Sequence, residues 1–177
     1  MIDANNDREI LGDANPKFFG GMSNTFAYKG VELNVFLQYS YGNKIYNYNA
    51  MELETPTGGT NGYRELLDRW TPENPSAVYP KATTNRSILV SDRFLEDGSY
   101  LKLKTASISY NFPNVNFKHV KGVRLYFTGQ NLLTWTKYRG YDPEVSYRGA
   151  STLQAGEDFG GYPQSRTYMF GIKLDIR

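Results

Sequence analysis

The chain has 177 residues, which is enough for one domain with a sizeable core, and its 20 basic and 18 acidic residues give a net charge of +2. This near balance excludes the basic footprint of a nucleic-acid-binding protein, and the absence of cysteine excludes disulfides, thiolate metal sites and a cysteine nucleophile. No apolar run approaches the ~18 residues of a transmembrane helix. The N-terminal residues also lack a signal-peptide pattern. If the protein is exported, we therefore expect this chain to be a fragment of a longer one.

The first patterned segment predicts a hairpin of two long strands. Residues 18–29 place Phe18, Met22, Phe26 and Tyr28 on one parity, and residues 31–41 alternate apolar and polar side chains apart from Phe36. Lys29-Gly30 is expected to form the tight turn between them. Arms of about eleven residues are long, because strands of soluble proteins have a mode near 5–6 residues.

The pattern is lost over residues 42–98. Within them Tyr63, Leu66, Leu67 and Trp70 recur at helical spacing, which predicts one short amphipathic helix over residues 61–70. The ordinary interpretation is that this stripe packs its helix onto neighbouring loops. The alternative is a partner-docking surface made of Tyr63, Leu66 and Trp70.

Two further long strands are predicted over residues 99–111 and 122–134, joined by a short connector marked by Pro113, Asn114 and Asn116. In the first of them the apolar parity changes between Leu103 and Ile108, so we expect a β-bulge near residues 104–106. A second irregular stretch runs from Trp135 to Pro163. Residues 166–177 alternate again and predict a fifth strand.

The connections alternate between short and long. They are short after the first and third strands and long after the second and fourth, so an up-and-down antiparallel arrangement brings all the long loops to one end. This layout is typical of outer-membrane β-barrels, whose strands of about ten residues cross a bilayer at a tilt. Five strands cannot close such a barrel, so we expect a truncated product or a piece of a longer chain. The alternative is a soluble β-sandwich, such as a carbohydrate-binding module.

Four segments resemble, in family order, the last part of SusC/RagA-type TonB-dependent outer-membrane transporters. They are GDANPKFFGGMSNTFAYKGVELNVFLQYSYGNKIYN, DGSYLKLKTASISYNFP, VRLYFTGQNLLTWTKYRGYDPEVS and GYPQSRTYMFGIKLDIR. The resemblance implies an all-β fold in which about five antiparallel strands form the C-terminal part of a ~22-stranded barrel with long extracellular loops. Residues 1–177 would then lack the plug, the TonB box and the signal peptide.

The same resemblance implies a function and partners. The chain would supply barrel wall and extracellular loops to an importer of glycans or peptides in the cell outer membrane. Expected partners are a SusD-like surface lipoprotein, the oligosaccharide or peptide substrate, membrane lipid, and TonB–ExbB–ExbD through the missing N-terminal part. No cofactor and no enzymatic activity are expected.

The aromatic residues of the second irregular stretch are the candidate ligand contacts, because sugars stack on aromatic faces. They are Trp135, Tyr138, Tyr141 and Tyr147. The alternative is that they form an interfacial girdle and pack the loop. We interpret Asp142 and Glu144 as part of a turn, and the lone histidine, His119, as a solvated turn residue, so no catalytic or metal-binding residue is predicted.

Overall fold

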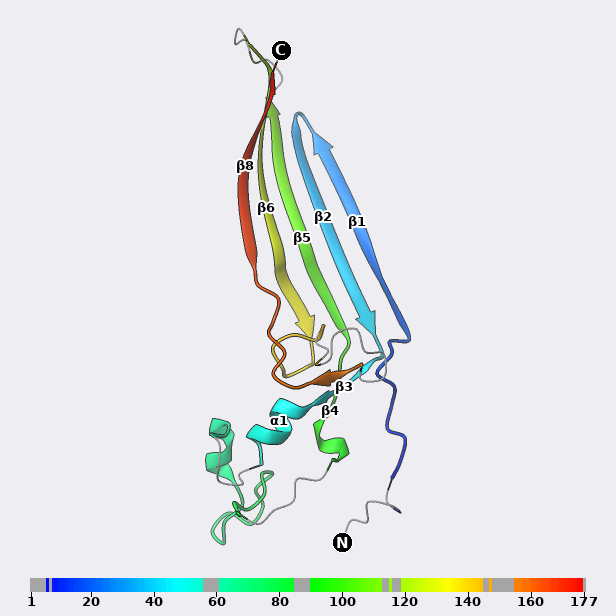
Figure 1. The fold of residues 1–177 in the computed structure, drawn as a ribbon, viewed down its shortest axis with the longest axis vertical. Helices are drawn as coiled ribbons and strands as arrows, with labels where there is room; N and C mark the ends of the chain where they lie inside the picture. Colours follow the sequence, from blue (N-terminus) through cyan, green and yellow to red (C-terminus); the bar gives the residue numbers. More distant parts are fainter. Residues whose placement is uncertain are drawn as a thin grey trace. The chain divides into compact units, whose positions relative to one another are not determined.

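The chain divides into two compact units. The computed structural model (Figure 1) describes residues 6, 8–55, 61–84, 90–112, 115, 119–144, 147 and 155–176. We call the first unit the sheet unit; it comprises Pro16–Tyr41, Ser99–Lys137 and Pro163–Arg177. We call the second the loop unit; it comprises Met1–Asn15, Gly42–Gly98 and Tyr138–Tyr162.

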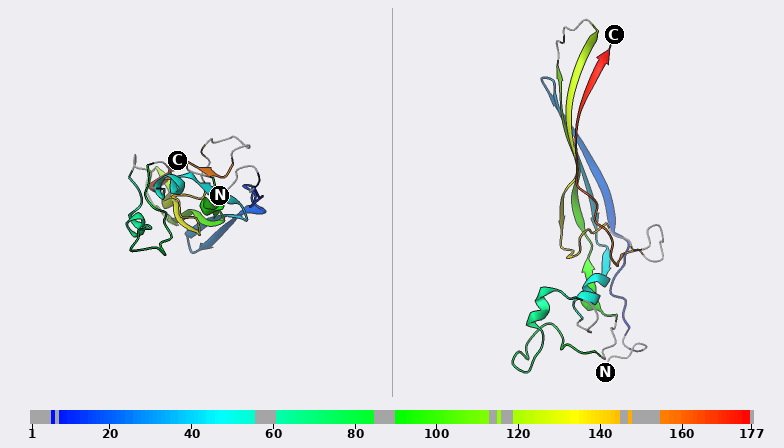
Figure 2. Two further views of the ribbon diagram at one scale, coloured as in Figure 1. Left: turned by 90° about the horizontal axis from the view of Figure 1, so that it is seen from below. Right: turned by 60° about the vertical axis from the view of Figure 1, so that its left-hand side comes forward.

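The sheet unit is one antiparallel sheet of five long strands in the order β1-β2-β5-β6-β8. Figures 1 and 2 show these strands side by side in a twisted layer with β1 and β8 at its edges. All five predicted strands are confirmed. Their bounds are β1 Phe18–Tyr28, β2 Val31–Tyr41, β5 Tyr100–Phe112, β6 Val120–Thr136 and β8 Thr167–Ile176.

The register aligns apolar side chains across the whole sheet. Since side chains alternate faces with period two, residues paired across the strands share a face. One such row runs Phe26, Leu33, Ile108, Phe127 and Phe170 from β1 to β8. A parallel row two residues away runs Tyr28, Val31, Tyr110, Leu125 and Ile172. One face of the sheet is therefore apolar from edge to edge.

The β-bulge predicted near residues 104–106 is present. The register of β5 shifts between Leu103 and Thr105 on both of its neighbours. Against β2, Lys104 is the extra residue, whereas against β6 the single Lys104 faces two residues, Asn131 and Leu132. Opposite it, Asn131 of β6 has a φ of 52°, a left-handed conformation that asparagine tolerates better than most residues. The bulge places Leu101 and Leu103 on the same apolar face as Ile108 and Tyr110.

The short turns of the sheet follow the expected chemistry. Lys29 and Gly30 both have positive φ, 46° and 85°, as a two-residue type I′ hairpin requires, and glycine adopts this conformation without a steric penalty. His119 lies in an exposed turn before β6, as expected. The predicted connector residues Pro113, Asn114 and Asn116 lie outside the described residues.

The loop unit contains short elements that the sequence did not reveal. β3 (Lys44–Asn47) pairs antiparallel with β4 (Leu95–Asp97) and parallel with β7 (Glu157–Asp158). Asn47 caps the following helix α1 (Tyr48–Leu53), because its side chain accepts a hydrogen bond from the amide of Ala50 at 2.9 Å. A small core forms around Ala50, Met51 and Phe94, with Tyr46 and Tyr48 packed against it.

The helix predicted over residues 61–70 is shorter and tighter than expected. It is a 3₁₀ helix, η1 (Arg64–Asp68), and a second 3₁₀ turn, η2, spans Asp92–Phe94. The chain becomes extended at Arg69, and the amide of Trp70 then donates to the carbonyl of Tyr79 at 2.9 Å. Pro72 also disfavours the helical conformation of the residue before it. No helix among the described residues is long and apolar enough to cross a membrane.

Candidate functional site

The apolar face of the sheet unit is exposed along all five strands. Its large side chains stay on the surface at mid-strand, including Phe26, Ile108, Phe127 and Phe170. Soluble monomers rarely expose continuous apolar patches larger than a few hundred Å². A face of this extent therefore requires lipid or another protein surface against it.

Aromatic rings gather at both ends of this face. At one end the rings of Phe18 and Tyr41 stack with centroids 4.9 Å apart, and the ring of Tyr39 lies 6.1 Å from that of Phe18. At the other end Tyr110 and Phe112 meet edge to face at 4.8 Å. Aliphatic and aromatic rows lie between the two clusters. This is the arrangement of the aromatic girdles that flank the apolar band of a membrane barrel.

The opposite face of the sheet carries a hydrogen-bonded polar network. Arg124 forms an ion pair with Glu32 at 2.8 Å and donates to the hydroxyl of Ser109 at 2.7 Å, which links β2, β5 and β6. The hydroxyl of Thr128 donates to that of Ser107 at 2.9 Å on the same face. The polar residues Arg124 and Thr128 of β6 therefore lie on the opposite face from its apolar residues Leu125 and Phe127.

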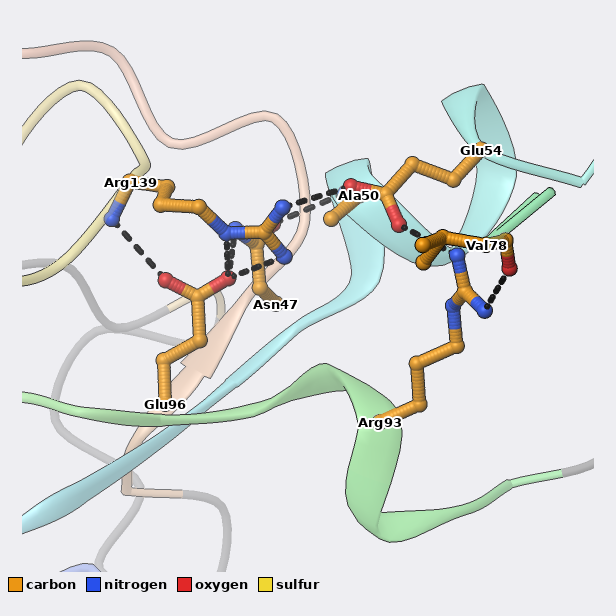
Figure 3. A network of polar contacts seen from close by, with 7 residues as sticks. All are labelled: Asn47, Ala50, Glu54, Val78, Arg93, Glu96 and Arg139. Carbon is orange, nitrogen blue, oxygen red and sulfur yellow. Dashed lines mark hydrogen bonds and ion pairs between the residues drawn. The ribbon is translucent and has the colours of Figure 1, made fainter. Parts of the chain in front are cut away.

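The loop unit is built around a charged network (Figure 3). The guanidinium of Arg139 donates to Glu96 through Nε at 3.0 Å and to Glu54 through Nη1 at 2.7 Å, and the Arg139 amide also donates to Glu96 at 2.9 Å. Arg93 reaches the other oxygen of Glu54 at 3.4 Å. Burial disfavours the charge on Arg139, but its bonds to Glu96 and Glu54 outweigh this effect and raise its pKa.

Tyr138, the neighbour of Arg139, is fixed by a buried carboxylate. Its side chain is only 5% exposed, and its hydroxyl donates to Oδ2 of Asp158, the second residue of β7. The amide of Gly161 donates to the other oxygen of Asp158 at 3.3 Å. Burial and the bond to Asp158 raise the pKa of Tyr138, so the phenol stays neutral over the physiological range.

The four candidate ligand residues occupy different environments. Trp135 shares the apolar face of the sheet unit with its partner Leu101, whereas the other three lie in the loop unit. Tyr138 is enclosed, Tyr141 is 84% exposed, and the half-exposed ring of Tyr147 meets that of Phe159 edge to face at 5.3 Å. Ligand contact by these residues stays a prediction.

The candidate docking residues are also only partly exposed. Leu66 is buried, Tyr63 is partly exposed, and Trp70 is half-buried with the ammonium of Lys81 5.7 Å from its ring centroid. Leu67, which follows Leu66 in η1, is largely exposed. Partner docking through Tyr63, Leu66 and Trp70 stays a prediction.

Among the described residues no group of acidic or histidine side chains is arranged to hold a metal ion. The amide of Glu144 donates to Oδ1 of Asp142 at 2.9 Å, as in the turn expected of Asp-Pro-Glu. Sequence patterns do not indicate that Glu54 and Glu96 meet Arg139, because the two carboxylates lie 85 and 43 residues away from it in the chain.

Comparison with known proteins finds TonB-dependent receptors as relatives of this chain. No family model matches the chain. TonB-dependent receptor P3 of Formosa agariphila is 38% identical over 174 residues, which are 95% of this chain and 17% of the receptor. TonB-dependent receptor SusC of Bacteroides thetaiotaomicron is 27% identical over 162 residues, 88% of this chain and 15% of SusC.

The solved structures that resemble this chain include the RagAB structures. The RagAB peptide importer in the 'closed-closed' state aligns with a TM-score of 0.82 and 29% identity over 98% of this chain and 19% of the matched chain. The RagAB peptide transporter aligns with a TM-score of 0.83 at the same identity and coverage. The chain thus spans less than one fifth of the length of these relatives. The proteins named here are described as receptors, importers and transporters, and none as an enzyme or a soluble carbohydrate-binding module.

Proposed function

Since the chain corresponds to the C-terminal β-barrel segment of SusC/RagA-type TonB-dependent receptors, we propose that it forms barrel wall and external loops of an outer-membrane nutrient importer. The observation that carries this proposal is the sheet unit, in which an exposed apolar face with aromatic rings at both ends lies opposite a polar, hydrogen-bonded face. The apolar face contacts lipid and the polar face looks into the barrel. The chain acts in transport and carries out no catalysis.

The whole importer is larger than residues 1–177, which form the C-terminal portion of a ~22-stranded barrel. The plug and the TonB box belong to the rest of that protein and receive energy from TonB–ExbB–ExbD. A SusD-like lipoprotein covers the external side and docks on the segment around η1 that carries Tyr63, Leu66 and Trp70. The imported nutrient is an oligosaccharide or a peptide.

Fractionation of native membranes tests this function directly. We expect an antibody against residues 1–177 to detect, in the outer-membrane fraction, a band far larger than the 20.2 kDa of this chain. The physical reason is that five strands leave two sheet edges that only further strands can pair. A soluble band near 20.2 kDa would overturn the proposal.

We propose ligand contact for Trp135, Tyr141 and Tyr147, with Tyr141 as the most exposed of them, whereas Tyr138 is enclosed and held by Asp158. We expect Tyr141→Ala in the full-length receptor to weaken substrate binding about tenfold, or ~1.4 kcal/mol, because the variant loses a stacking face. Trp135→Ala tests the candidate at the end of β6, on the apolar face of the sheet unit, by the same measurement of equilibrium binding of the imported substrate. Tyr162→Ala is the matched control, since Tyr162 is an equally exposed tyrosine of the same connection. Unchanged affinity in both test variants would discard the assignment.

A further inference from the structure

Arg139 joins parts of the loop unit that are distant in the sequence. Glu54 follows α1 and Glu96 lies in β4, so both carboxylates belong to the first long connection, residues 42–98. Arg139 belongs to the second long connection, residues 138–162. The three nitrogens of its guanidinium lie 2.7–3.0 Å from oxygens of the two carboxylates. Figure 3 shows the guanidinium between Glu54 and Glu96.

The carboxylates depend on Arg139 because they are buried. The Glu54 side chain is 3% exposed and that of Glu96 10%, whereas that of Arg139 is 53% exposed. A buried carboxylate without a cationic partner pays a large desolvation cost, so loss of Arg139 destabilises the segments that carry the two glutamates. The effect therefore reaches beyond the segment that carries Arg139.

Each carboxylate is also tied to its own surroundings. Oε1 of Glu96, which the guanidinium of Arg139 binds, also accepts from Nδ2 of Asn47 at 3.0 Å, and the same asparagine caps α1. The second oxygen of Glu54 is held by Arg93, whose Nη1 donates to the carbonyl of Val78 at 3.1 Å. A change at Arg139 is thereby transmitted to the start of α1 and to the segment around Val78.

We propose that Arg139 is an electrostatic clamp that makes the two long connections open as one body. When the clamp is closed, residues 42–55 and 90–98 are ordered together with residues 138–144. When the ion pairs of Arg139 are broken, both connections loosen together, although among the described residues Arg139 is the single side chain that the second connection contributes to the ion pairs with Glu54 and Glu96. This coupling of the two connections is independent of the nutrient that the importer carries.

Hydrogen exchange on the full-length receptor tests the clamp. In Arg139→Gln we expect amide exchange to rise about tenfold in residues 44–55 and 93–98 as well as in residues 138–144. Arg64→Gln is the matched control, because Arg64 is an exposed arginine of the same unit, and its exchange should equal that of the wild type. The strands of the sheet unit serve as an internal reference for a folded barrel. An increase confined to residues 138–144 would overturn the clamp.

A double variant separates the clamp from a general loss of packing. Glu96→Gln combined with Arg139→Gln removes one buried charge together with its partner, so its exchange should fall between that of the wild type and that of Arg139→Gln alone. Arg139→Lys keeps the charge but loses the fork that reaches both carboxylates, and should show a smaller joint increase. If the double variant exchanges faster than Arg139→Gln in both connections, the ion pairs do not couple them and the proposal fails.

Discussion

Two neighbouring residues show how far the sequence reveals individual contacts. The sequence predicts Tyr138 as a ligand contact, yet both Tyr138 and its neighbour Arg139 are bound by carboxylates of the loop unit. Glu96 and Glu54 lie 43 and 85 residues from Arg139 in the chain. Strand and helix periodicity report only on neighbours in sequence, so pairs this distant are visible only in the folded chain.

The raised pKa of Tyr138 predicts a loss of stability at alkaline pH. Burial and the bond to Asp158 place its folded pKa above the unfolded value of ~10. The stability that the neutral phenol contributes is therefore complete below pH ~10 and is lost as the pH rises towards the folded value. We expect the loop unit to open in that range, measured as increasing cleavage of residues 138–162 by an alkali-tolerant protease.

Phenylalanine substitutions at Tyr138 and Tyr162 separate the contribution of the Tyr138 phenol to the alkaline loss of stability from that of other groups. Tyr138→Phe should lower stability near neutral pH by ~1–3 kcal/mol, since the buried Asp158 loses a donor, and should weaken the alkaline dependence. Tyr162→Phe changes an exposed phenol of the same unit and should retain the wild-type profile. An alkaline transition of the same size in Tyr138→Phe would show that another group causes it.

At the scale of elements the long strands were predictable, because apolar and polar residues alternate over ten or more positions. Even the bulge at Lys104 was visible, since the apolar parity changes within one strand. The short elements were hidden: a four-residue strand and the six-residue helix α1 have too few positions for a period to emerge. The helical spacing of apolar residues within 61–70 did predict a turn of helix, but not the extended backbone from Arg69 onward.

Two adjacent residues of β8 test the assignment of the faces. Phe170 lies on the apolar face opposite Phe127, and Met169 lies on the polar face opposite Thr128. A lysine in contact with lipid costs ~2–4 kcal/mol near the middle of the bilayer, whereas polar-face substitutions are tolerated. We therefore expect Phe170→Lys to reduce the amount of folded receptor, measured by its heat-modifiable migration in gels, and Met169→Lys to leave it nearly unchanged. Equal damage from both would contradict the assignment.

At the scale of the whole molecule the sequence indicated the class through the order of short and long connections. The turns after β1 and β5 are short, and the two long connections leave the other end of the sheet, as in an up-and-down barrel. What the sequence could not show is that the two long connections fold into one unit with its own small sheet. This assembly depends on the parallel pairing of β3 with β7 and on ion pairs between distant residues.

The network at Arg139 has a consequence for building chimaeric receptors. A graft of residues 138–162 into a related barrel transfers the arginine without Glu54 and Glu96. The two connections therefore form a single exchangeable cassette. Chimaeras that move residues 42–98 and 138–162 together keep every charge of the network with its partner.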